Sequence, residues 1–294
     1  MCRVTLLLSV VGVIGVSASG PLMAWIAAPA LAIAFWRNAL GTVVMLPSAL
    51  TRHRPEITAL DRRALLGTAF AGLMLAGHFA TWVSSLKLTS VASATALQAL
   101  QVAFVVLIDR LRGCPVHKAV VVGLLVSSSG VFVVSGVDLT LSTRALAGDL
   151  LALAGGVFAA AYVVTGGTMR QSMTTTAYTT LCYGTCAITM LACCLIGRQS
   201  LGGYEPTTWL GLLAVTVSAQ LLGHSIFNHL LAVMSPTVVS LTLLLEVPGA
   251  ALLASIFLGQ APPLGVYAGL ILVLTGLVIV VLRQPTAQLE APVD

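Results

Sequence analysis

Residues 223–237 read Gly-His-Ser-Ile-Phe-Asn-His-Leu-Leu-Ala-Val-Met-Ser-Pro-Thr, and residues 244–250 read Leu-Leu-Glu-Val-Pro-Gly-Ala. The two segments place two histidines, an asparagine and a glutamate in sequence that is otherwise apolar enough to lie in lipid. A charge at the centre of a bilayer costs at least about 2.5–3.5 kcal/mol, so such a residue usually faces a protein-lined or watery interior. Pro248 should also break its helix at mid-length, and broken helices near the midplane expose backbone groups to substrates in many transporters. We therefore expect a membrane protein with a polar interior site.

The composition agrees with a chain that lies mostly in lipid. Of its 294 residues, 58% are hydrophobic and 8% are charged, whereas a soluble domain carries about 25% charged residues. The formal net charge is +5, but the basic residues are spread over short loops, which argues against nucleic acid as a partner. Cys182 and Cys186 lie four apart without a Cys-x-x-Cys motif, and we interpret them as apolar helix residues. We expect the lipid bilayer as a partner, and no metal or other cofactor.

Ten apolar runs are candidates for transmembrane helices, each of which needs about 20 apolar residues. The expected spans are residues 4–20, 29–50, 64–86, 90–111, 119–137, 148–169, 174–197, 207–233, 236–258 and 265–282. No convincing Ala-x-Ala cleavage site follows the first run, so we expect a retained helix and not a cleaved signal. Residues 1–143 and 144–284 then hold five spans each, and residues 285–294 form a cytoplasmic tail.

The distribution of lysine and arginine predicts the orientation of these spans. With a cytoplasmic N-terminus, ten basic residues fall inside and three fall outside, and Arg37 lies within a span. Those inside are Arg3, Arg52, Arg54, Arg62, Arg63, Arg110, Arg112, Lys118, Arg170 and Arg283, and those outside are Lys87, Arg144 and Arg198. We therefore predict a multi-pass protein of the plasma (inner) membrane with both termini in the cytoplasm.

The two groups of five spans are related by a fixed offset of 146 residues, which separates Gly77-His78 from Gly223-His224. The same offset matches Gly113 with Gly259, Gly123-Leu124 with Gly269-Leu270, and Gly130 with Gly276. Because five is odd, the second group must enter the membrane with the opposite orientation, as in the inverted repeats of several secondary transporters. The expected fold is an all-α integral membrane protein with ten transmembrane helices in two inverted-topology five-helix repeats.

Four short motifs resemble a known family along essentially the whole chain. They are Ala32-Ile-Ala-Phe-Trp-Arg37, Gly148-Asp-Leu-Leu-Ala-Leu153, Leu244-Leu-Glu246 and the closing Gly269-Leu270 with Thr275-Gly276. With the two five-span halves, they resemble the drug/metabolite transporter superfamily in its EamA-like branch. The chain departs from the family pattern at Glu246-Val247-Pro248, where glutamate commonly precedes proline directly, and at Gly259-Gln260, where many members have Gly-Glu. The resemblance implies a secondary carrier, often an exporter of amino acids or other small metabolites, with a central cavity between the halves.

Two charged residues, Glu246 and Arg37, lie well inside expected spans. Glu246 can act as a cavity carboxylate that binds a cationic group or takes up a coupling proton, or it can be a structural group beside the helix break. Arg37 is always charged. It can pair with Glu246, hold an anionic substrate or reach for an interface, although its position near the middle of a span argues against the last.

Further polar residues are candidates for substrate binding or coupling. His78 and His224 occupy equivalent positions, so both should approach the axis between the halves, and histidine titrates near neutral pH. On a regular helix Gln220, His224 and Asn228 share one face and form a polar stripe. Gln98 and Gln101 also face one way, and Trp82 lies four residues after His78. For each of these, helix–helix contact or packing is the alternative.

These residues predict a secondary active transporter that moves an amino acid or related polar or amphipathic solute across the inner membrane. Alternating access is the expected mechanism, export the expected direction, and a monomer or homodimer the expected state. Proton coupling through Glu246 or a histidine is one option, and a facilitator or exchanger fits the same residues.

Other classes of protein fit the sequence less well. No enzyme activity is expected, because the sequence has no His-Glu-x-x-His motif and no second carboxylate besides Glu246 well inside a span. A nucleotide-sugar or phosphate antiporter of the same superfamily should have several basic residues in its cavity, and only Arg37 is available. A channel usually needs rings of like groups from several subunits. A membrane protein without transport activity stays open as an alternative.

Overall fold

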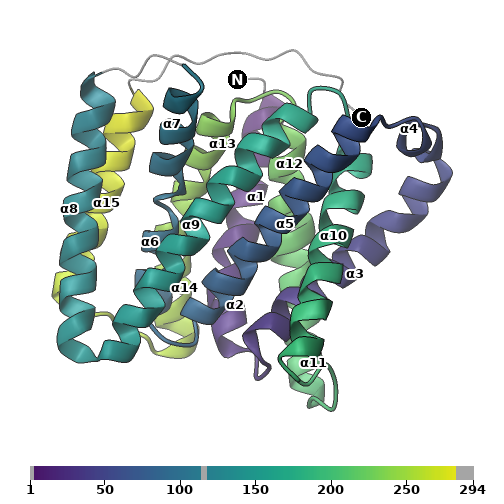
Figure 1. Ribbon diagram of the computed structural model, residues 1–294. Helices are drawn as coiled ribbons and strands as arrows, with labels where there is room; N and C mark the ends of the chain where they lie inside the picture. Colours follow the sequence, from purple (N-terminus) through teal and green to yellow (C-terminus); the bar gives the residue numbers. More distant parts are fainter. Residues whose placement is uncertain (1–2, 114–117, 283–294) are drawn as a thin grey trace.

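The computed structural model describes residues 3–113 and 118–282, and within these ranges the regular structure is entirely helical (Figure 1). The helices of the first half are α1 (Arg3–Ser17), α2 (Ser19–Trp25), α3 (Ala30–Thr51), α4 (Arg54–Thr58), α5 (Arg62–Ser85), α6 (Val91–Gln98), α7 (Gln101–Leu111) and α8 (Lys118–Leu141). Those of the second half are α9 (Thr143–Met169), α10 (Thr175–Ile196), α11 (Pro206–Val215), the π-helix η1 (Thr216–Ser225), α12 (Ile226–Leu230), α13 (Pro236–Thr242), the 3-10 turn η2 (Leu243–Leu245), α14 (Glu246–Leu258) and α15 (Leu264–Leu282).

Among the described residues, eight helical stretches are long and apolar enough to cross a membrane. They correspond to the expected spans except the fifth and the tenth. In the helices of those two spans, α8 and α15, the described side chains cover the shorter apolar runs Lys118–Val133 and Leu264–Gly276. The short helix α4, which connects α3 to α5, was not expected from the sequence.

Helix boundaries follow the capping residues. The helix α9 begins at Thr143, ahead of the expected residue 148, because the Ser142 hydroxyl accepts a hydrogen bond from the Ala145 amide at 3.0 Å. Asp61, Ser90 and Thr174 cap α5, α6 and α10 in the same way. At the C-terminal end of α14, Gly259 has a left-handed backbone with φ of 62°, which glycine adopts without strain.

Several spans are interrupted inside the bundle. The first span continues past residue 20 to Trp25 and divides between α1 and α2, and the fourth divides between α6 and α7. In the ninth span the break lies at η2, immediately before Glu246, whereas the sequence placed it at Pro248. Pro248 instead occupies the first turn of α14, where its ring excludes the carbonyl of Leu244 from regular helical geometry. The tight turn therefore forms ahead of the proline.

The contacts between the two halves are symmetric under exchange of the halves. The pairs α3 with α10 and α8 with α15 join helices at equivalent places in the two halves, and the contact of α6 with α14 is matched by that of α13 with α7. The pairing of α5 with α9 is matched by that of η1 with α1. Within the α8–α15 contact, a Cβ atom added to Gly130 would meet the Gly269 carbonyl, and one added to Gly276 would meet the Gly123 carbonyl. Reciprocal contacts of this kind are the mark of a two-fold relationship.

Candidate functional site

A small cavity lies where the interrupted spans meet in the interior of the bundle. Its volume is about 30 Å³, room for about two water molecules. The polar and aromatic lining residues are His78, Trp82, Gln98, Gln101, Tyr162, His224, Phe227, Asn228 and Glu246. Aliphatic residues from α1, α9, α13 and η2, and Leu231 directly after α12, complete the wall. Seven of the nine sequence candidates line the cavity, while Gln220 and Arg37 lie elsewhere.

The break at η2 positions Glu246 in this wall. Glu246 is the first residue of α14, and its side chain is 7% exposed. Among the described residues its carboxylate makes no hydrogen bond and no ion pair. It is also the only residue with a formal charge that lines the cavity in the described part of the chain. The cavity therefore carries one carboxylate whose acceptor capacity the protein does not use.

A backbone contact fixes the orientation of His78. Its Nδ1 atom lies 3.1 Å from the carbonyl oxygen of Gly155 on α9, and a carbonyl only accepts, so Nδ1 carries the proton. In the neutral ring Nε2 is then an acceptor. The ring also stacks on Trp82, with centroids 5.5 Å apart and an angle of 14° between the planes. Trp82 therefore packs against His78 and also lines the cavity.

The equivalent histidines of the two halves come close together in the cavity wall. The ring centroids of His78 and His224 are 6.4 Å apart. His224 also lies 6.4 Å from the Tyr162 ring and makes an edge contact with Phe79 at 5.4 Å. The offset of 146 residues pairs Trp82 with Asn228 and Val16 with Tyr162 as well, and all four of these residues line the cavity. The wall is therefore built from corresponding places of both halves.

Gln98 and Gln101 stand on either side of the break between α6 and α7. The Gln98 side-chain amide donates to the Gln101 side-chain oxygen at 3.2 Å. Both side chains are buried and line the cavity. The contact uses one donor and one acceptor, so the Gln98 side-chain oxygen keeps its full acceptor capacity.

Tyr162 is a cavity residue that the sequence analysis missed. Its hydroxyl donates to the Asn228 side-chain oxygen at 2.5 Å, and the Asn228 amide donates to the Tyr183 hydroxyl at 3.3 Å. An aromatic residue in an apolar helix has no pattern that separates a cavity position from a packing position. Phe227 was missed for the same reason.

Arg37 and Gln220 belong to a separate network beside the cavity. Arg37 is fully buried, so it does not reach an interface. Its Nε atom donates to the Gln220 side-chain oxygen at 2.9 Å, and the guanidinium lies 4.1 Å from the centre of the Phe79 ring. Its oxygen partners are therefore Gln220 and Ser19, and not Glu246. The Gln220 amide in turn donates to the side-chain oxygen of Asn38 at 3.0 Å.

The expected stripe of Gln220, His224 and Asn228 is therefore wrong for its first member. Gln220 and His224 both lie in η1, which is a π-helix. A π-helix has i→i+5 hydrogen bonds, so residues four apart no longer fall on one face. Gln220 is turned toward α3, while His224 and Asn228 face the cavity.

A second buried arginine, Arg170, donates a hydrogen bond to the backbone of the cavity residue Asn228. Arg170, expected among the cytoplasmic loop residues, is fully buried at the end of α9. Its Nε atom donates to the Asn228 carbonyl at 2.9 Å, and its other nitrogens donate to the Thr175 hydroxyl at 2.8 Å and to the Met173 carbonyl. Arg170 thus ties the α9–α10 turn to the cavity residue Asn228.

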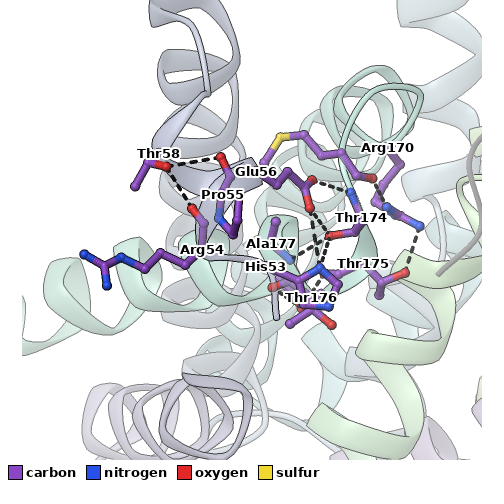
Figure 2. A network of polar contacts seen from close by, with 12 residues as sticks. His53, Arg54, Pro55, Glu56, Thr58, Arg170, Thr174, Thr175, Thr176 and Ala177 are labelled. Atoms are coloured by element: carbon purple, nitrogen blue, oxygen red, sulfur yellow. Dashed lines mark hydrogen bonds and ion pairs between the residues drawn. The ribbon is translucent and has the colours of Figure 1, made fainter. Parts of the chain in front are cut away.

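Next to Arg170, two residues of the first half, His53 and Glu56, contact Thr174 at the start of α10 (Figure 2). The Glu56 carboxylate on α4 accepts from the Thr174 amide at 2.7 Å and from the Thr174 hydroxyl at 2.6 Å. The His53 ring lies 3.5 Å from the same carboxylate and 3.2 Å from the Thr174 hydroxyl. Because Thr174 caps α10, the loop from one half completes a helix terminus of the other.

The opposite end of the bundle, which carries α2 and α11 in Figure 1, is held by Lys87. Its ammonium donates to the carbonyls of Met23, Ala24 and Ile26 at 2.8, 3.2 and 2.8 Å. These carbonyls end α2, where a cation is favourable. Burial lowers the pKa of Lys87. A cation therefore joins helices of the first half at this end, as Arg170 joins helices of the second half at the other.

Comparison with known proteins places this geometry in context. A family model described as the EamA-like transporter family matches the chain twice, over residues 3–136 and 146–282. No curated protein matches the chain. A solved structure titled "Crystal structure of protein" is similar to it, with a TM-score of 0.69 and 18% sequence identity over 97% of this chain and 100% of that one. At this identity the likeness shows a common fold alone.

Proposed function

Because the chain belongs to the EamA-like transporter family, we propose that it is a secondary transporter of a small polar or amphipathic metabolite, such as an amino acid or a related solute. The observation that carries the proposal is the buried cavity, whose wall combines corresponding residues of both halves with an unpaired carboxylate. The direction that we propose is export across the plasma membrane. The basic residues near α4 and at the end of α7 favour the cytoplasm for that end of the bundle.

The proposed architecture is two inverted five-helix repeats, residues 1–143 and 144–284, that work by alternating access. The symmetric pairing of helices across the halves supports it. In such a pair, exchange of the two conformations turns a cavity that is open on one side into one that is open on the other. The small cavity volume and the contacts of Lys87 and Glu56 at the two ends are those expected of a closed intermediate.

Glu246 is the proposed coupling and binding group. It is an intramembrane carboxylate that faces a polar cavity, a setting in which carboxylates relay protons or pair with cationic groups. His78 and His224 are the neighbouring groups that can exchange a proton with it or with water in the cavity. Arg37 is proposed to be structural, because its Nε atom donates to Gln220, its guanidinium lies over the Phe79 ring, and it does not line the cavity.

The alternative of a nucleotide-sugar or phosphate antiporter fits this cavity less well. A phosphate group is usually recognised by several lysines or arginines. In the described part of the chain no lysine or arginine lines the cavity, and its one charge is negative. A phosphorylated cargo would therefore meet repulsion instead of pairing.

Reconstitution of the purified protein into liposomes tests the proposal. Labelled amino acids and small amines are offered as a pool, with and without a pH gradient. We expect saturable uptake or counterflow of one class of solute, which Glu246→Gln and His224→Ala reduce. Glu205→Gln is the matched control, because Glu205 is an exposed carboxylate outside the cavity. Absence of flux for every pooled solute, with folded protein, would contradict the proposal for these solutes.

A further inference from the structure

We propose that the cavity selects an organic cation, a protonated amine with an aromatic or apolar body, over the zwitterionic amino acid that carries the same body. The inference rests on the proposed transport function and names its substrate class. Three features of the cavity carry it: the sign of its charge, the balance of its free hydrogen-bonding groups, and its aromatic wall.

The charge of the cavity is the first feature. Glu246 supplies a carboxylate that is 7% exposed and that pairs with no described residue. A buried carboxylate is normally paired or hydrogen-bonded. A cation in the cavity would supply the missing partner, whereas the carboxylate of an amino acid would bring a second negative charge. Arg37 makes no ion pair with Glu246, because its Nε and Nη1 atoms point to Gln220 and Ser19, which lie outside the lining.

The free acceptors are the second feature, beside the Trp82 indole N–H, a lining donor that has no partner among the described residues. The Nδ1–H group of His78 is taken by the Gly155 carbonyl, which leaves Nε2 as an acceptor in the neutral ring. The Tyr162 hydroxyl donates within the protein to Asn228, and the Asn228 amide donates to Tyr183. The Glu246 oxygens and the Gln98 side-chain oxygen remain. An alkylammonium has three donors and no acceptor, so it complements this set.

The aromatic wall is the third feature. Trp82, Tyr162 and Phe227 line the cavity from three different helices. Aromatic faces attract cations, and aromatic cages are a common way to bind substituted ammonium groups. The cavity of about 30 Å³ holds the ammonium head in this conformation. The body of the cargo requires the wider cavity of an open state.

Four solutes with one common ring system separate the alternatives: phenylethylamine, phenylalanine, phenylethanol and phenylpropionate. They are cationic, zwitterionic, neutral and anionic near neutral pH. Counterflow in liposomes reports transport, and titration calorimetry on the purified full chain reports binding. We expect phenylethylamine to exceed phenylalanine by about tenfold or more in both assays, the ratio that a difference of about 1.4 kcal/mol produces.

Variants of the carboxylate make the test specific. Glu246→Gln should lower phenylethylamine binding and counterflow by about tenfold or more, while Glu246→Asp keeps a measurable part of both. Glu205→Gln should leave both unchanged. Thermal unfolding shows whether each variant is folded, and Glu246→Asp keeps the inference testable if Glu246→Gln is not.

The outcomes separate this inference from the transport proposal. If phenylalanine or phenylpropionate moves as fast as phenylethylamine, and Glu246→Gln leaves amine binding intact, the chain is a carrier but the inference is overturned. If neither binding nor counterflow occurs for any of the four, the inference fails, and the solute pool alone then tests transport. Amine binding that depends on Glu246 without counterflow supports the inference and counts against the carrier.

Discussion

The Ser127 hydroxyl on α8 donates a hydrogen bond at 3.1 Å to the backbone carbonyl of Val273 on α15, the residue 146 positions further along the chain. This is the same offset that relates His78 to His224. Two equivalent residues that touch each other must lie on the axis that relates their halves. On either side of them, Gly130 contacts Gly269 and Gly276 contacts Gly123, so the contact is reciprocal.

We predict that Gly130→Ala and Gly276→Ala destabilise the protein to a similar extent. At both positions the added methyl group would meet backbone atoms of the opposite helix, which cannot move aside. Overpacking of this kind costs about 1–3 kcal/mol. Thermal unfolding in detergent measures the effect. Gly184→Ala is the control, because its Cβ would lie 3.8 Å from the nearest atom, a side-chain methyl of Thr42. A large difference between Gly130→Ala and Gly276→Ala would count against the two-fold relationship.

Much of this fold can be predicted from hydropathy and from the repeat offset. The bilayer requires long apolar helices, so the spans are visible as runs, and the offset of Gly77-His78 identifies positions that meet at the axis. Seven of the nine candidate residues line the cavity. Polar residues in an apolar helix must be accommodated somewhere, and a shared interior is the usual place.

The remaining details depend on local backbone geometry that composition does not encode. The π-helix η1 rotates Gln220 away from His224, although a regular helix would align them. Arg170 follows an apolar span like any cytoplasmic arginine, but three acceptors draw it into the protein. Tyr162 matches Val16 across the repeat, and this pairing gives no chemical signal of a cavity position.

We predict that Arg170 acts as a positioning residue for Asn228. Arg170→Gln removes donors from the Asn228 carbonyl and the Thr175 hydroxyl, and bonds from charged groups contribute about 1.5–3 kcal/mol each. Stability should fall and the maximal transport rate should fall with it. Arg170→Lys should restore part of both, because one ammonium keeps the charge but not the planar set of donors. Arg63→Gln, at an exposed position, should change neither. Equal transport kinetics for Arg170→Gln and the unmodified protein would contradict the assignment.

The contact between Glu56 and Thr174 should couple the two halves energetically. Thr174→Ala removes the capping hydroxyl of α10 and is expected to cost about 1 kcal/mol. Glu56→Gln weakens the bonds to the Thr174 amide and hydroxyl. A double-mutant cycle on the unfolding free energy should give an interaction energy of about 0.5–3 kcal/mol. Additive effects of the two substitutions would mean that α4 does not hold α10.

Lys87 gives a prediction about alkaline pH. Burial lowers the pKa of its ammonium in the folded protein, so between that value and the unfolded value of about 10.4 the unfolded chain binds more protons. Stability therefore rises with pH across this window. In Lys87→Met the contribution is absent, and the stability of the unmodified protein relative to this variant should increase as the pH rises toward the unfolded value. Unfolding midpoints over that range measure the difference, and a decrease would show that the carbonyl contacts raise the pKa instead.

The last prediction separates the network of Arg37 from the cavity. Gln220→Leu leaves the Arg37 Nε atom and the Asn38 side-chain oxygen without their partners in a buried site. An unpaired buried group of this kind costs about 1–3 kcal/mol, and more where it is charged. The thermal stability of the variant should therefore fall, whereas the KM for cargo should stay close to that of the unmodified protein. Gln98→Leu is the matched substitution within the cavity, and there KM should rise with a smaller loss of stability. A rise in KM for Gln220→Leu without loss of stability would contradict this prediction. It would mean that Gln220 acts in the cavity, on the face that a regular helix would give it.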